Sequence, residues 1–192
     1  APVIDLEDEI EIKVVEKGKY PHVSRSFVPI LCNNCEKPIC LANCPVEATW
    51  QREDGIVMID QHRCIGCKYC IASCHYDVRY VNPLKKYVQK CTFCDHRVAQ
   101  GQLPACVQTC LGRSRIFGDV NDPKSEVSRL VAGGKTVTLK PEKGTRPQVY
   151  YIKPERIAFD QGSAAPESAA ARTDAEAFYK HNRGSRFFAG VI

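Results

Sequence analysis

Apolar positions in this chain fall in short runs separated by turn-forming residues. Residues 9–15 alternate between charged and apolar side chains, and this period of two predicts a half-exposed strand that ends near Gly18 and Pro21. A second apolar run at residues 27–31 contains Pro29, which confines it to a sheet edge or an irregular segment. No window approaches about 18 consecutive apolar residues, so the sequence predicts no membrane span of its own.

A hairpin is predicted in the middle of the chain. Residues 48–52 and 56–60 have the composition of two short strands, and Asp54-Gly55 between them is a strong turn signal. Trp50 lies in the first of these strands. Since large aromatic side chains are most often buried, we expect Trp50 to pack in the core rather than to face a partner.

The predicted helices are short. Residues 39–44, 69–74 and 95–100 each have the length of one or two helical turns. A longer amphipathic helix is predicted to begin with Asp122 as its N-cap and Pro123 at its first helical position.

The C-terminal part is predicted to be extended and then irregular. Residues 136–140 and 148–152 are typical of two strands, whereas residues 161–176 are rich in Ala, Ser and Glu and indicate a linker. The aromatic residues that follow are too few to build a core, so we expect this tail to dock on another subunit: Phe178, Tyr179, Phe187 and Phe188.

The number of cysteines is the most unusual feature of the composition. The 192-residue chain has 12 cysteines but one Met and one Trp, which indicates that metal clusters replace part of the hydrophobic core. Disulfides are the first alternative, but they usually join dispersed cysteines in short secreted chains. Zinc is the second, but zinc ribbons use two cysteine pairs rather than tight triplets.

Eight cysteines form two runs whose spacing is typical of iron–sulfur proteins. In each run three close thiolates can hold one corner of a cubane, while the fourth lies beyond a helical turn and is better placed for a second cluster. The runs are Cys32-x₂-Cys35-x₄-Cys40-x₃-Cys44 and Cys64-x₂-Cys67-x₂-Cys70-x₃-Cys74.

This spacing predicts that the two runs exchange their fourth ligands. One [4Fe–4S] cluster is then held by Cys32, Cys35, Cys40 and Cys74, and its neighbour by Cys64, Cys67, Cys70 and Cys44. Exchanged ligands would hold the clusters side by side. We expect Gly66 to allow close approach of the backbone to a cluster. Four nearby cations could raise the cluster potential, but for most of them we expect a solvated surface charge: Lys68, Arg79, Lys85 and Lys86.

A third group is more widely spaced. Its four cysteines can hold a third cluster locally, or can form half of another exchanged pair: Cys91, Cys94, Cys106 and Cys110. His75 and His96 stand near cysteines, but histidine is an exceptional ligand of these clusters, so we expect both to lie outside the ligand sets.

The charge balance follows from the same clusters. The formal net charge is +5. Three [4Fe–4S]²⁺ clusters with four thiolates each would bring the loaded protein to about −1. The basic residues are dispersed and form no arginine-rich run, so the sequence does not favour nucleic-acid binding.

In these cysteine groups, and in the phrase Ile116-Phe-Gly-Asp-Val-Asn-Asp-Pro123, the sequence resembles the ferredoxin-like electron-transfer subunits of the dimethyl sulfoxide reductase family. The resemblance covers roughly residues 13–152. That family usually has a further cysteine run near the N-terminus, which is missing from this sequence. Three clusters are therefore expected, with [3Fe–4S] as an alternative for one of them, and a fourth only if residues ahead of Ala1 are missing.

The resemblance implies an electron-transfer subunit with no catalytic residues. Its expected partners are a catalytic oxidoreductase subunit of the molybdopterin type and an integral membrane quinone-interacting or cytochrome subunit. We expect it at the periplasmic face of a bacterial or archaeal membrane complex, with the cytoplasmic face as the alternative, because the first residue is Ala1 rather than Met. The rival functions are a zinc-stabilised binding module and an enzyme with an open-iron cluster.

The predicted fold class is α+β. We expect tandem ferredoxin-like lobes, with short helices and hairpins built around [4Fe–4S] clusters, and a long irregular C-terminal extension. The predicted parts are an N-terminal strand segment at 1–31, a polyferredoxin core at 32–120, packing segments at 121–160 and a partner-docking tail at 161–192.

Overall fold

The computed structural model describes residues 11–134, 136–152 and 187–191. These residues form two compact units, and the chain passes between them more than once. The first unit contains residues 11–33, 39–50 and 59–92, and the second contains residues 34–38, 51–58 and the described residues from 93 onward.

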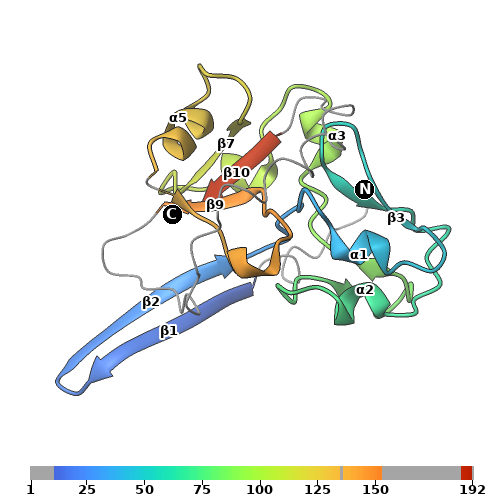
Figure 1. Ribbon diagram of the computed structural model, residues 1–192, viewed down its shortest axis with the longest axis horizontal. Coiled ribbons are helices and arrows are strands. Elements are labelled where there is room, and N and C mark those ends of the chain that lie inside the picture. Colours follow the sequence, from blue (N-terminus) through green and yellow to red (C-terminus); the bar gives the residue numbers. More distant parts are fainter. Residues whose placement is uncertain (1–10, 135, 153–186, 192) are drawn as a thin grey trace, which may run out of the picture. The chain divides into compact units, whose positions relative to one another are not determined.

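The first unit begins with a long antiparallel hairpin (Figure 1). Strand β1 (Glu11–Lys19) pairs with β2 (His22–Ile30) along its whole length, from Glu11 opposite Ile30 to Lys19 opposite His22. The predicted N-terminal strand is confirmed over its described residues. It is more exposed than expected, because nearly all of β1 faces solvent. Only the end of the hairpin next to Cys32 is buried, through Val28, Ile30 and Leu31.

Two one-turn helices follow the first cysteines of each run. Helix α1 (Ile39–Ala42) packs against α2 (Tyr69–Ala72), as Figure 1 also shows. Both helices were predicted, and their contact brings the two cysteine runs together within this unit. A two-residue strand pair, β5 (Tyr80–Val81) with β6 (Val88–Gln89), follows α2.

The predicted hairpin between the runs is confirmed. Strand β3 (Thr49–Gln51) pairs with β4 (Val57–Ile59), and Gly55 in the turn has a φ of 87°. The expected burial of Trp50 is wrong. Thr49 is buried, and because successive strand residues face opposite sides, Trp50 turns outward and is 46% exposed.

The second unit is built on a mixed four-stranded sheet in the order β7-β10-β9-β8. Its strands are β7 (Arg115–Asp119), β8 (Thr136–Val137), β9 (Val149–Ile152) and β10 (Phe187–Val191). Strand β10 is antiparallel to β7 and parallel to β9. The two predicted extended segments are confirmed as β8 and β9, whereas β7 was not predicted.

Three α-helices and one 3₁₀ helix are described in the second unit. They are α3 (Asp95–Val98), α4 (Ala105–Gln108), α5 (Glu126–Ala132) and η2 (Pro141–Lys143). The predicted helical turn at 95–100 is confirmed by α3. Helix α5 begins three residues later than predicted. Asp122 accepts a hydrogen bond from the Lys124 N–H and so closes a turn ahead of the helix.

The C-terminal extension is described only at its end. The predicted linker at 161–176 and the residues Phe178 and Tyr179 lie outside the described residues. Residues 187–191 pair with β7 and β9 of the same chain, and docking of the tail on a partner remains a prediction. The described elements, short helices with antiparallel hairpins, confirm the α+β class. Within the described residues, no helix has the length and hydrophobicity needed to cross a membrane.

Candidate functional site

The three cysteine groups share one backbone feature near their start. In each, the residue immediately before the second cysteine has a left-handed backbone: Asn34 (φ 40°), Gly66 (φ 67°) and Phe93 (φ 60°). Such a residue turns the chain so that successive N–H groups face the same side, a geometry that binds anions. Each of the three loops between the first two cysteines therefore has a backbone turn that suits an anion.

The last cysteine of each group ends in the same turn. Its N–H bonds the carbonyl three residues earlier, and its own carbonyl accepts the N–H three residues later. The residue three positions beyond it is left-handed in every case. The cysteines are Cys44, Cys74 and Cys110, followed by Glu47 (φ 51°), Asp77 (φ 57°) and Arg113 (φ 48°). The spacing predicted this repeat only for the first two cysteines.

Cys44 and Cys110 share a further feature, a cradle of backbone N–H groups around the sulfur. The Ala48 N–H donates to Cys44 Sγ at 3.2 Å, and the Ser114 N–H donates to Cys110 Sγ at 3.3 Å. Burial alone would raise the pKa of Cys44, but hydrogen bonds from the backbone N–H groups of Thr49, Val46 and Ala48 lower it. The pKa of Cys110 is lowered by the Ser114 hydroxyl and N–H, with further N–H groups from Arg115 and Gly112. Both sulfurs are thus placed to carry negative charge.

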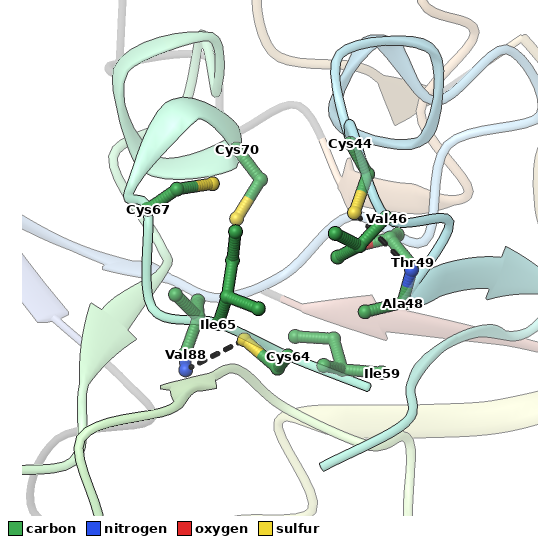
Figure 2. A pocket seen from close by; sticks show the side chains of 10 residues that line it. All are labelled: Cys44, Val46, Ala48, Thr49, Ile59, Cys64, Ile65, Cys67, Cys70 and Val88. Carbon is green, nitrogen blue, oxygen red and sulfur yellow. Dashed lines mark hydrogen bonds between the residues drawn. The ribbon is translucent and has the colours of Figure 1, made fainter. Parts of the chain in front are cut away.

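Four cysteines stand around one hollow in the first unit (Figure 2). Cys44 comes from the first run, and Cys64, Cys67 and Cys70 come from the second. The hollow measures about 310 Å³, counting the part open to solvent. No charged side chain lines it, and its other lining residues are Val46, Ala48, Thr49, Ile59, Ile65 and Val88.

These donors fit an iron–sulfur cluster. Four thiolates in an apolar wall are the usual ligands of a [4Fe–4S] cluster, and N–H groups near the sulfurs tune it. The Val88 N–H donates to Cys64 Sγ at 3.5 Å, as the Ala48 N–H does to Cys44 Sγ (Figure 2). The residues that the spacing assigned to one cluster are therefore brought together, although the ligand assignment itself remains a prediction.

The second predicted ligand set also meets in the first unit, through three of its four members. Burial raises the pKa of Cys40 to about 11; the Arg79 guanidinium acts to lower it, while Cys32 and Cys74 are close enough to raise it further. Cys74 of the second run thus lies with Cys32 and Cys40 of the first. Cys35, the fourth member, belongs to the second unit, where its carbonyl accepts a hydrogen bond from Gln51 Nε2 at 3.1 Å.

The third group is divided between the two units. Cys91 belongs to the first unit, and Cys94, Cys106 and Cys110 belong to the second. Cys94 precedes α3 and Cys106 lies within α4. In the part of the chain that the structure describes, no three His, Cys, Asp or Glu side chains converge tightly enough to hold a single metal ion.

Two buried cations were not anticipated. Arg79 is 4% exposed and Lys90 is 3% exposed, so the expectation that Arg79 is a solvated surface charge is wrong. Arg79 Nη2 donates to Cys40 Sγ at 2.8 Å, and Lys90 Nζ donates to the Cys91 carbonyl at 2.9 Å. The only signal in the sequence is that Arg79 interrupts a short apolar segment, and Lys90 gives none. Lys68, Lys85 and Lys86 are exposed, as expected.

Comparison with known proteins relates this chain to iron–sulfur proteins. The family described as 4Fe-4S dicluster domain matches residues 23–120. The B subunit of tetrathionate reductase from Salmonella typhimurium is 46% identical over 140 residues, which cover 72% of this chain and 56% of the relative. A putative iron-sulfur B subunit of dimethyl sulfoxide reductase from Halobacterium salinarum is 42% identical over 161 residues, which cover 72% of this chain and 62% of the relative. The B component of polysulfide reductase from Wolinella succinogenes is 42% identical over 126 residues, which cover 65% of this chain and 66% of the relative. The sequence thus spans only about three fifths of the length of these relatives.

Proposed function

Because this protein belongs to the 4Fe-4S dicluster domain family, we propose that it is an electron-transfer subunit that passes single electrons through a row of [4Fe–4S] clusters. The observation that carries this proposal is the hollow in which Cys44 of one run meets Cys64, Cys67 and Cys70 of the other. An exchanged ligand requires two neighbouring clusters, and neighbouring clusters suit electron transfer better than substrate chemistry.

When bound, the clusters supply one-electron redox chemistry, and the protein's part is to hold and tune them. The cysteines would fix each cluster, and apolar side chains such as Val88 and Ile59 line the hollow. Backbone N–H groups at Ala48 and Val88 donate to ligand sulfurs and favour the more negative, reduced state.

The proposed ligands are those predicted from the spacing. The first cluster takes Cys32, Cys35, Cys40 and Cys74, and the second takes Cys64, Cys67, Cys70 and Cys44. The third takes Cys91, Cys94 and Cys106, with Cys110 as the local fourth ligand if three clusters are the full set.

A second assignment of Cys110 is favoured by its geometry. Its turn and its N–H cradle repeat those of Cys44, which faces the cysteines of another run. By this parallel Cys110 would serve a fourth cluster. The other ligands of that cluster, and a replacement ligand for the third, would come from outside this sequence, because its other 11 cysteines are already assigned.

The serine variants Cys106→Ser and Cys110→Ser distinguish the two assignments. If Cys110 closes the third site locally, both variants lose the same EPR signal. If Cys110 serves another cluster, Cys106→Ser changes the third cluster and Cys110→Ser leaves that signal intact. Cluster loading in both variants is checked by iron and labile-sulfide analysis.

We further propose that catalysis belongs to a separate oxidoreductase subunit of the molybdopterin type. Electrons would pass between it and an integral membrane quinone-interacting or cytochrome subunit. The names of the relatives, as B subunits or B components of reductases, support this placement. We place the complex at the periplasmic face of the membrane, with the cytoplasmic face as the alternative. Copurification from fractionated cells tests both the partners and the compartment.

The finer fold prediction also belongs to this proposal. The cysteine loops that recur in three groups support tandem ferredoxin-like lobes across residues 32–120. Residues 121–160 would pack on this core, and residues 161–192 would form the partner-docking extension.

The deciding experiment is iron and labile-sulfide analysis of the intact protein together with low-temperature EPR. Three clusters predict roughly 12 iron atoms and 12 sulfides per chain. Cys44→Ser and Cys67→Ser should both alter the EPR signal of the second cluster. Cys40→Ser should instead alter the signal of the first cluster. Stoichiometric zinc in a colourless protein would establish the zinc module instead. If Cys44→Ser and Cys40→Ser altered the same signal, the exchange of ligands would be ruled out.

A further inference from the structure

Arg79 is a buried arginine that lies beside sulfurs from both cysteine runs. Its Nη2 donates to Cys40 Sγ at 2.8 Å, and its Nη1 donates to Thr49 Oγ1 at 3.3 Å. The Cys70 side chain also lies close enough to interact electrostatically with the guanidinium. Cys40 belongs to the first run and lies in α1, whereas Cys70 belongs to the second and lies in α2. One planar guanidinium therefore donates to a predicted ligand of one cluster and lies beside a predicted ligand of the other.

In the part of the chain that the structure describes, the groups placed to balance the charge of Arg79 are cysteine sulfurs, Cys40 Sγ above all. Among the described residues, no carboxylate forms an ion pair with Arg79. Arg79 is 4% exposed, and burial disfavours a charged side chain. A buried cation is stable only when it is paired, so the geometry requires negative charge on these sulfurs.

Ligated cysteines supply that charge. A [4Fe–4S]²⁺ cluster with four thiolates carries about 2−, and an electron entering it adds one more negative charge beside the guanidinium. The electron comes from one neighbouring carrier and leaves to the next, while Arg79 stays protonated throughout. Hydrogen bonds to ligand sulfur stabilise the more negative state and raise the reduction potential.

We propose that Arg79 is a positioning residue shared by the first and second clusters, and that its guanidinium raises the reduction potentials of both together. This inference rests on the proposed function. It goes beyond that function by assigning one residue outside the ligand sets to the control of both clusters.

The test is EPR-monitored redox titration of the intact, cluster-loaded protein and of three variants. Arg79→Gln removes the charge and the Nη donors while keeping a polar but shorter side chain. Arg79→Lys keeps the charge but offers a single ammonium in place of the bifurcated guanidinium. Arg63→Gln is the matched control, because Arg63 adjoins Cys64 in sequence but is exposed.

In Arg79→Gln the ratio of reduced to oxidised protein at a fixed ambient potential should fall about tenfold or more for each cluster, which equals about 59 mV for a one-electron couple. Arg79→Lys should lower one potential and leave the other close to wild type. Arg63→Gln should change neither by more than about twofold, because water and salt screen an exposed charge. If Arg79→Gln keeps its iron and shifts one potential or none, the inference is wrong.

A measurement on the wild-type protein covers the case in which Arg79→Gln fails to assemble. With ¹⁵N-labelled arginine, pulsed EPR should detect nitrogen coupling to both reduced clusters, and Arg79→Lys should lose it. Coupling to one cluster or to none overturns the inference. A wild-type protein without iron and sulfide would instead overturn the proposed function itself.

Discussion

Gly66 lies where the second cysteine loop passes close to the Lys86 carbonyl. Its φ of +67° is a conformation that other residues rarely adopt, and an added Cβ would lie 2.5 Å from the Lys86 oxygen. That oxygen belongs to the backbone and cannot rotate away. The loop between Cys64 and Cys67 therefore depends on glycine for two separate reasons, strain and space.

Gly66→Ala should destabilise the protein more than Gly101→Ala does. Gly101 has a similar φ of +71° but nothing within 4 Å of an added Cβ, so it reports strain alone. We expect Gly101→Ala to lower the free energy of unfolding by about 1 kcal/mol, and Gly66→Ala by more than about 2 kcal/mol with loss of second-cluster iron. Denaturant unfolding and iron analysis of the loaded proteins measure both. Equal losses in the two variants would show that the contact with Lys86 is unimportant.

The equivalent residue of the third group shows why residue conformation is only partly predictable. Gly66 could be recognised in the sequence, because glycine between clustered cysteines indicates a close approach. Phe93 has nearly the same left-handed backbone, which no local preference of phenylalanine favours. Its conformation is fixed by packing, since Phe93 is buried beside Ile56 and its ring lies 5.6 Å from that of Phe117. These contacts are remote in sequence and leave no local signal.

Among the elements, α5 and β7 approach each other unusually closely. An added Cβ at Gly118 of β7 would lie 2.4 Å from Ser125 Oγ and 3.3 Å from Val127 Cγ2. Ser125 is the N-cap of α5, but its hydroxyl makes no capping hydrogen bond. Within the described part of the chain, this buried oxygen has no hydrogen-bond partner. Ser125 is therefore held for its small size rather than for capping.

Ser125→Ala should accordingly leave the free energy of unfolding unchanged or raise it by up to about 1 kcal/mol. The same substitution at an N-cap that makes its hydrogen bond would lower it by about 1 kcal/mol. Gly118→Ala should cost about 1–3 kcal/mol through overpacking. In the double variant the hydroxyl is gone, and we expect at least about 1 kcal/mol of that loss to be recovered. A double-mutant cycle from denaturant unfolding gives the coupling. Additive effects would mean that the two residues do not meet.

Asp122→Ala tests the turn ahead of the same helix. The carboxylate accepts the Lys124 N–H at 2.9 Å, and we expect its loss to cost about 0.5–1.5 kcal/mol. Asp122→Asn, which keeps the accepting oxygen, should retain most of the stability in denaturant unfolding. If both variants behaved alike, the charge rather than the hydrogen bond would be the stabilising feature.

Elements with local partners were the predictable ones. The hairpin of β3 and β4 followed from Asp54-Gly55, and α1 and α2 followed from the cysteine spacing itself. Strand β7 was missed, because its partner β10 lies at the far end of the chain and strand pairing at that distance has no turn signal. The start of α5 was misplaced because Asp122-Pro123 suits a turn as well as a helix N-terminus.

For the molecule as a whole, the meeting of the two cysteine runs was predictable and the burial of cations beside them was not. The spacing alone placed Cys44 with Cys64, Cys67 and Cys70, and the hollow has that lining. Nothing in a single sequence separates a buried arginine or lysine from an exposed one. Arg79 and Lys90 are buried in a unit whose predicted ligands carry the compensating negative charge.

This balance predicts that the fold depends on its clusters. If iron is removed by a chelator under reducing conditions, Cys40, which accepts a hydrogen bond from Arg79, becomes a neutral thiol, since burial raises the pKa of Cys40 to about 11. Arg79 and Lys90 would then be buried cations without anionic partners, at a cost of several kcal/mol for each. Small domains seldom have more stability than this to lose.

We therefore expect the chelated protein to lose its cooperative unfolding transition, measured by circular dichroism. Arg79→Gln provides the control, because it removes one of the two unbalanced charges. Its chelated form should retain more structure than chelated wild type, even though its loaded form is less stable. Wild type would then be the more stable of the two proteins when loaded and the less stable when chelated. This change of order requires that the clusters neutralise buried cations as well as connect cysteines. If the chelated wild-type protein unfolded cooperatively at an unchanged midpoint, hydrophobic packing alone would be sufficient for the fold.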